Sequence, residues 1–126
     1  MEKILNYING ELVAPTNGNY LDNYNPSNGE AYSLIPDSEK QDIDNAVAAA
    51  KAAFKTWSKT PKQKRSNILM KLADTIEKYS EELIKAESKD NGKPESLAAH
   101  VDIPRAPANI RFFAGAILHD SSEMHE

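Results

Sequence analysis

The chain contains no cysteine, and its five glycines and single tryptophan are sparse among 126 residues. Without cysteine, these residues can form neither a disulfide nor a thiolate metal site, and they hold no cysteine nucleophile. The glycines are too scattered to form a dinucleotide-binding fingerprint or a phosphate-binding loop. The longest apolar run, residues 112–118, falls far short of the roughly 20 residues that a membrane-spanning helix needs.

Neither sign of charge forms a patch. Fifteen basic residues are scattered among nineteen acidic ones, with a net charge of −4, so the electrostatic footprint of a nucleic-acid or membrane-surface protein is missing. Residues 1–6 are polar almost from the start and lack the apolar core of a signal peptide. We therefore expect a soluble cytoplasmic protein that binds neither nucleic acid nor membranes, and that forms one small domain or part of a larger one.

The first third of the chain has the pattern of short strands separated by turns. Asn-Gly at 9–10 lies between apolar pairs, which is a strong hairpin signal. Residues 20–24 and 31–35 are rich in β-forming types, and the turn-forming sequence 25–29 separates them. We expect three or four strands in a β-meander over about residues 6–36.

The pattern becomes helical over about residues 38–119. Ser38 with Gln41 has the form of a capping box at the start of the first helix. Apolar residues then recur at helical spacing, and the aromatic side chains among them are expected to pack in a core. The stripe of the first helix comprises Ile43, Ala46, Val47, Ala50, Phe54 and Trp57, and Tyr79 closes that of the second.

Later signals divide the helical part into about four helices. Gly92 suits the end of a third helix. Pro104 and Pro107 precede the last apolar run, and because proline removes a helical hydrogen bond, a helix should begin or kink near Pro104. The predicted fold class is therefore α+β, a short meander followed by about four helices.

The residues themselves show no active site. His100, His119 and His125 have no metal-ligand spacing and are expected at the surface. An acidic group lies in the first turns of the first predicted helix, where the helix dipole accounts for it better than a metal site does. These acidic residues are Asp37, Glu39, Asp42 and Asp44.

Six segments carry a resemblance to a known family, in matching order and spacing. They are residues 7–11, 25–30, 42–57, 65–76, 87–94 and 111–115. Together they resemble the N-terminal quarter of the aldehyde dehydrogenase superfamily, and Asp-Ile-Pro-Arg-Ala at 102–106 is similar to the hydroxymuconic-semialdehyde dehydrogenase-like subgroup. The resemblance implies that residues 1–126 are an N-terminal portion of the NAD(P)-binding domain in the α/β aldehyde dehydrogenase fold.

The same resemblance implies chemistry that lies outside this chain. The parent would oxidise an aldehyde or semialdehyde to a carboxylic acid with NAD or NADP, through a cysteine nucleophile and a glutamate-activated water. Those residues and most of the cofactor site would follow residue 126. By itself the chain is predicted to be inactive, with no catalytic or cofactor-binding residue and no tight cofactor binding.

One site can be carried over from the family. Many members bind a structural monovalent cation, and the matching positions here are the backbone oxygens of Asn23 and Tyr24 and the carboxylate of Asp90. Hard oxygen ligands suit such an ion. The alternative for Asp90 is an aspartate that stabilises its own turn, and the sequence leaves both open. A further ligand would lie outside the chain.

Two hypotheses about the role of the chain remain. It is an N-terminal fragment of a dehydrogenase, or a stand-alone, non-catalytic interaction module from the same family. The aperiodic C-terminal residues favour the fragment. In the family the helices pack on the cofactor-binding sheet, so we expect this chain to bind the remainder of the polypeptide, to self-associate or to pack loosely. The parent is expected to be a homo-oligomer.

Overall fold

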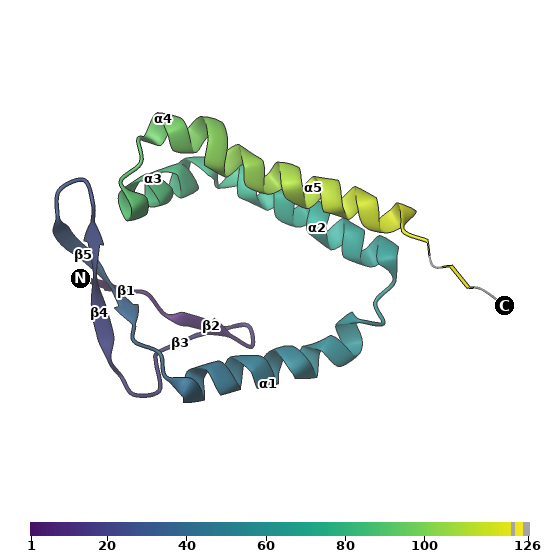
Figure 1. Ribbon diagram of the computed structural model, residues 1–126, viewed down its shortest axis with the longest axis horizontal. Coiled ribbons are helices and arrows are strands. Elements are labelled where there is room, and N and C mark those ends of the chain that lie inside the picture. Colours follow the sequence, from purple (N-terminus) through teal and green to yellow (C-terminus); the bar gives the residue numbers. More distant parts are fainter. Residues whose placement is uncertain (122, 125–126) are drawn as a thin grey trace. The chain divides into compact units, whose positions relative to one another are not determined.

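The computed structural model describes residues 1–121, 123 and 124 (Figure 1). The chain divides into two compact units. The first comprises Met1–Lys59 with Asp90–Gly92, and the second comprises Thr60–Lys89 with Lys93–Glu126. The α+β class is confirmed, because short strands precede the helices. Among the described residues, no helix is both long and apolar enough to cross a membrane.

The first unit contains two small sheets. In one, β1 (Glu2–Lys3) pairs in parallel with β5 (Glu30–Pro36), and β4 (Tyr20–Asn25) pairs antiparallel with the other side of β5. In the other, β2 (Asn6–Ile8) and β3 (Glu11–Val13) form an antiparallel hairpin. The hairpin prediction is confirmed. The strands do not form one meander, because β2 and β3 form a sheet of their own and β1 pairs in parallel with β5.

The turn of the hairpin follows directly from its two residues. Asn9 has a φ of 56° and Gly10 a φ of 84°. A two-residue turn with positive φ at both positions matches the twist of paired strands, and Asn-Gly is the pair that adopts it at least cost. Local chemistry therefore decides this element. By contrast, β1 has only two residues, too few for any alternation to be recognised in the sequence.

The first helix, α1 (Lys40–Trp57), does not begin at the predicted capping box. Asp42 rather than Gln41 accepts a hydrogen bond from the start of the helix, from the Glu39 N–H at 2.9 Å. The Ser38 hydroxyl and the Asn6 side-chain amide lie 2.8 Å apart instead. The Ser38–Gln41 prediction is wrong because Ser38 contacts Asn6 instead, and Asp42 rather than Gln41 accepts the backbone hydrogen bond at the start of the helix.

Asp42 also binds a loop that is distant in sequence. Its carboxylate accepts hydrogen bonds from the Thr16 N–H at 2.9 Å and the Thr16 hydroxyl at 2.5 Å. Those bonds, led by the hydroxyl, hold the pKa of Asp42 below its usual range. The helix dipole alone does not explain why an aspartate occupies position 42, since its carboxylate also joins the loop before β4 to α1 by hydrogen bonds.

The second unit is helical. It contains α2 (Lys62–Lys78), most of α3 (Ser80–Asn91), α4 (Glu95–Leu97), a π-helical turn η1 (Ala98–Asp102) and α5 (Ile103–His119). The helices α2 and α5 pack side by side (Figure 1). Ala73 of α2 and Ala114 of α5 are completely buried, so small side chains let the two backbones approach closely.

The prolines shape the start of α5 as expected. The helix α5 has Pro104 in its first turn and continues directly from η1, because Asp102 and Ile103 both have α-helical backbone angles. Just before it, the Ile103 N–H bonds to the Ala98 carbonyl, one residue wider than in an α-helix. Pro107 lies inside α5 and is buried. The apolar contact of its ring opposes the loss of one helical hydrogen bond.

Several large apolar side chains remain exposed. Phe54 is 65% exposed, Trp57 42% and Tyr79 44%, so the prediction that these aromatics pack in a core is wrong for this chain. The completely buried apolar side chains of the described part are all alanines, at 73, 98 and 114. The helical stripes were recognised correctly, but these residues supply little for them to pack against.

Candidate functional site

The carboxylate of Asp90 meets two side chains from the larger sheet of the first unit. Asp90 lies in the last turn of α3, which ends before Gly92. The Tyr32 hydroxyl donates a hydrogen bond to Oδ1 of Asp90 at 2.7 Å, and Nδ2 of Asn23 donates to the same oxygen at 3.1 Å. Asn23 and Asp90, two of the residues that are predicted to bind a cation, thus lie together, although 67 residues separate them.

A β-bulge brings Tyr32 into this cluster. In the ladder, Asn23 pairs with Ser33 and Tyr24 pairs with Ala31, so Tyr32 is the extra residue on β5. Neighbouring side chains of a regular strand point to opposite faces. Here Nδ2 of Asn23 donates both to the Tyr32 hydroxyl at 2.9 Å and to the Ser33 hydroxyl at 3.2 Å. The bulge therefore turns two successive side chains toward one amide.

The hydrogen bonds set the charge of the cluster. The contacts from Asn23 and then Tyr32 hold the pKa of Asp90 below its usual range. The hydrogen bond to Asp90 raises the pKa of Tyr32. At neutral pH the site therefore combines an ionised carboxylate with a neutral phenol. Both donors bind Oδ1, and no described side chain donates to Oδ2 of Asp90.

Tyr24, the remaining predicted residue, lies beside the bulge but turns its side chain away. Its ring is 55% exposed, and its hydroxyl contacts a carboxylate oxygen of Asp22 at 3.3 Å. Only the backbone of Tyr24 is therefore available for the predicted role. Tyr32 and Ser33, which is 2% exposed, were missed by sequence reasoning, because nothing in a strand sequence marks the position of a bulge.

A close backbone approach supports the cluster. The turn between β4 and β5 is closed by the Gly29 N–H bonding to the Asn25 carbonyl at 2.8 Å, and Oδ1 of Asn25 accepts the Ser27 N–H at 2.9 Å. A Cβ on Gly92 would lie 3.0 Å from Cβ of Pro26. Residues 90–92 therefore pass so close to the strand turn that a side chain at position 92 would press against the Pro26 ring.

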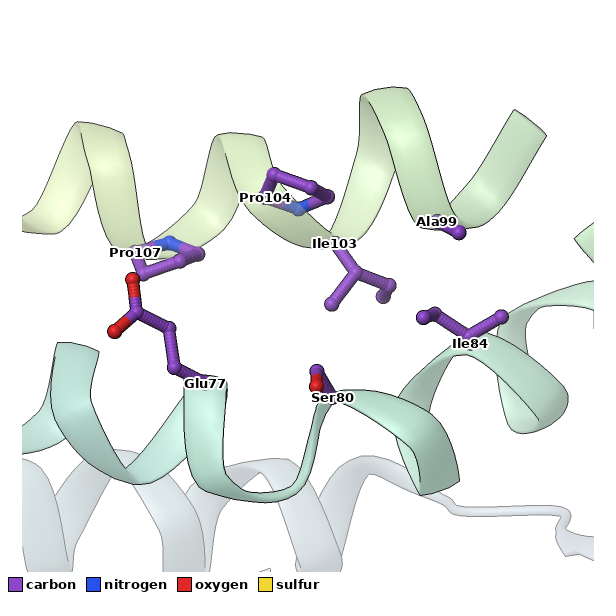
Figure 2. A pocket seen from close by; sticks show the side chains of 7 residues that line it. All are labelled: Glu77, Ser80, Ile84, Ala99, Ile103, Pro104 and Pro107. Carbon is purple, nitrogen blue, oxygen red and sulfur yellow. The ribbon is translucent and has the colours of Figure 1, made fainter. Parts of the chain in front are cut away.

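A second concave region lies in the second unit, a pocket of about 310 Å³. Figure 2 shows Glu77 and Ser80 across from Ile103 and Pro107 of α5. The Glu77 carboxylate pairs with Arg111, which holds the pKa of Glu77 below its usual range. The acid of this pocket is thus already paired. Apart from this paired carboxylate, none of the described residues that line the pocket is a base that could make Ser80 a nucleophile.

The histidines agree with their predicted surface positions where the structure describes them. His100 is exposed, with Nδ1 2.7 Å from the Ser96 carbonyl oxygen, and His119 is also exposed. His125 lies outside the described residues. Within the described ranges, no group of three or more histidine, aspartate or glutamate side chains could hold a metal ion.

Comparison with known proteins decides the family. Residues 13–126 match the aldehyde dehydrogenase family. The chain belongs to this family. It is 51% identical over 118 residues to a 2-aminomuconic semialdehyde dehydrogenase of Bos taurus, covering 94% of this chain and 24% of that protein. It is 38% identical over 127 residues to a 2-hydroxymuconic semialdehyde dehydrogenase of Pseudomonas sp. (strain CF600), covering 100% of this chain and 26% of that protein.

A solved structure gives the same result for the fold. The chain superposes on PnpE in complex with nicotinamide adenine dinucleotide with a TM-score of 0.86 and 41% sequence identity, covering 91% of this chain and 23% of that one. The resemblance to the aldehyde dehydrogenase family and to its semialdehyde dehydrogenase subgroup is confirmed. The chain is an N-terminal part of an aldehyde dehydrogenase and spans about a quarter of the length of the curated relatives it matches.

Proposed function

We propose that this chain is the N-terminal segment of an NAD(P)-dependent aldehyde dehydrogenase that oxidises a semialdehyde to a carboxylic acid. The observation that carries the proposal is the 51% identity to a 2-aminomuconic semialdehyde dehydrogenase over 94% of the chain. The segment has no cysteine, so the nucleophile would come from the remainder of the enzyme. Its own task would be structural, as an N-terminal portion of the NAD(P)-binding domain.

The exposed face of α1 supports this structural role. Ile43 is 60% exposed, Val47 45% and Phe54 65%. Apolar side chains at helical spacing on one face are unfavourable in water and normally bury against a partner. We propose that the remainder of the dehydrogenase covers this face in a homo-oligomeric parent. When the chain is alone, a second copy would take its place.

The cofactor would be NAD or NADP, bound by the parent. The PnpE relative was solved with nicotinamide adenine dinucleotide. The segment has no glycine-rich fingerprint, so we expect it to bind neither dinucleotide tightly by itself.

We also propose that Asp90, with backbone oxygens of Asn23 and Tyr24, contributes to a site for a structural monovalent cation. The donor chemistry fits. Asp90 is ionised, because hydrogen bonds lower its pKa, and its second carboxylate oxygen accepts no hydrogen bond from the described residues. The bulge beside Asn23 and Tyr24 interrupts the regular ladder at the required backbone positions.

A chimeric enzyme tests the main proposal. The matching quarter of the bovine 2-aminomuconic semialdehyde dehydrogenase is replaced by this chain, and semialdehyde-dependent NADH formation is measured. We expect a folded, active oligomer, and no activity from the 126-residue chain alone. The control is the same chimera with Ala114→Asp, which places a charge in the α2–α5 contact and should abolish folding. A folded chimera without activity, or activity from the chain alone, would overturn the proposal.

Sedimentation distinguishes self-association through the exposed face of α1 from binding of that face to the remainder of the enzyme. The chain is examined alone and after co-expression with the remaining three quarters of the bovine enzyme. We expect association in the first sample and a stoichiometric complex in the second. Phe54→Ser, on the exposed face of α1, should weaken both. If the chain sediments as a compact monomer and forms no complex with the bovine remainder, the structural role is contradicted.

A further inference from the structure

The arrangement around the bulge assigns a task to Tyr32. We propose that Tyr32 is a positioning residue of the Asp90 cation site, holding one carboxylate oxygen so that the other meets the ion. The inference rests on the cation site proposed above. It adds a residue that lies outside the predicted ligands and that acts through Asp90 rather than touching the ion.

The partners of Asp90 argue against a turn-stabilising aspartate. Such an aspartate accepts hydrogen bonds from backbone N–H groups of its own turn, as Asn25 does from Ser27. Asp90 instead accepts from the side chains of Tyr32 and Asn23, 58 and 67 residues away along the chain. Its carboxylate is therefore oriented by the sheet, not by the local turn.

The charge balance points to a cation. Both partners of Asp90 are neutral donors, an amide and a phenol, and no described lysine or arginine pairs with this carboxylate. Neutral donors orient a carboxylate without cancelling its charge. Asp90 is exposed, and so an ion from solvent can reach the charge that remains. By comparison, Glu77 has its charge cancelled directly by Arg111.

The two carboxylate oxygens of Asp90 have different roles in this geometry. Tyr32 Oη and Asn23 Nδ2 lie at 2.7 and 3.1 Å from Oδ1. The two protons of Asn23 Nδ2 are shared among Oδ1, the Tyr32 hydroxyl at 2.9 Å and the Ser33 hydroxyl at 3.2 Å. The Tyr32 hydroxyl therefore meets Asn23 as an acceptor and Asp90 as a donor. The phenol proton is thereby directed at Oδ1, and Oδ2 stays available for an ion.

The test compares Tyr32→Phe with Tyr7→Phe. Each variant loses one tyrosine hydroxyl from the first unit, but only Tyr32 contacts Asp90, whereas Tyr7 is 72% exposed. Thermal unfolding of the 126-residue chain is followed by circular dichroism in potassium, sodium or choline chloride at constant ionic strength. We expect potassium or sodium to raise the midpoint of the unmodified chain relative to choline. Tyr32→Phe should raise the half-saturating cation concentration about tenfold, the order expected for one lost hydrogen bond to a charged group.

The control variants separate the two proposals. Tyr7→Phe should match the unmodified chain, and Asp90→Asn should abolish the cation response. If Tyr32→Phe lowers the midpoint equally in choline and potassium, with unchanged half-saturation, Tyr32 is only structural and the inference fails while the cation site stands. If the unmodified chain responds to choline, sodium and potassium alike, the cation site itself fails.

A second measurement uses the unmodified chain and does not depend on the variant folding. Ring resonances of Tyr32 are followed by NMR during titration with potassium chloride, with choline chloride as the reference. An ion at Asp90 reduces the negative charge beside the phenol, so the Tyr32 resonances should shift with the half-saturation seen in thermal unfolding. The ring of Tyr79, in the second unit, serves as the internal control. A stationary Tyr32 signal alongside a thermal response to potassium would overturn the inference.

Discussion

Replacing Gly92 by alanine tests whether the approach of residues 90–92 to the strand turn stabilises the first unit. Gly92 has a φ of 75°, a conformation that costs an L-residue roughly 1–2 kcal/mol. The new Cβ would also lie 3.0 Å from Cβ and 3.6 Å from Cγ of Pro26. A proline ring is stiff, and this one lies in a turn that the Asn25 and Gly29 hydrogen bond closes.

The structure provides a matched control for the backbone cost. Gly10 has a φ of 84°, and a Cβ there would meet nothing within 4 Å. Gly10→Ala should therefore lower the free energy of unfolding only by the cost of the left-handed conformation, roughly 1–2 kcal/mol. Gly92→Ala should add about 1–3 kcal/mol for the forced displacement of the Pro26 turn. We expect Gly92→Ala to be the more destabilising change by about that second amount.

The assay is urea unfolding of the 126-residue chain. Fluorescence of Trp57, the single tryptophan, reports on the first unit, and circular dichroism reports on the whole chain. If Gly92→Ala and Gly10→Ala reduce the free energy of unfolding equally, the approach to Pro26 contributes nothing and the support of Asp90 by that turn must be abandoned.

Two further predictions concern the second unit. Ala114→Leu should lower its free energy of unfolding by about 1–3 kcal/mol, because α2 and α5 leave no room at this buried site; an unchanged urea midpoint would contradict the close packing. Arg111 lowers the pKa of Glu77, so the stabilisation by Glu77 should be complete above the ordinary carboxyl pKa of 4.5 and be lost as the pH falls through the lower, folded-state value. Glu77→Gln should flatten that acid dependence, and an identical pH profile for both proteins would refute it.

Local patterns in the sequence predicted much of the fold. The Asn-Gly hairpin and the end of α3 at Gly92 follow from backbone preferences of the residues themselves. The change from the π-helical turn to α5 just before Pro104 agrees with the missing proline N–H. Such features depend on a few neighbouring residues, so no knowledge of the tertiary structure was needed to find them.

The candidate site was only partly predictable. The resemblance to the family named Asn23, Tyr24 and Asp90, and the structure brings the side chains of the first and last together. Tyr32 could not be found this way, because its position depends on the bulge in β5. A bulge arises from how two strands align, so the sequence of either strand alone does not show where it lies.

What the sequence by itself determined was the α+β order of elements, the helical stripes and the family, because each depends on residue type and spacing along the chain. The tertiary structure alone decided that β1 pairs with β5, since 26 residues lie between these two strands (Figure 1). It also decided that Asp42 binds Thr16 rather than only capping α1. Contacts between segments distant in sequence depend on where the folded backbone places them, and that placement made Tyr32 and Asp90 neighbours.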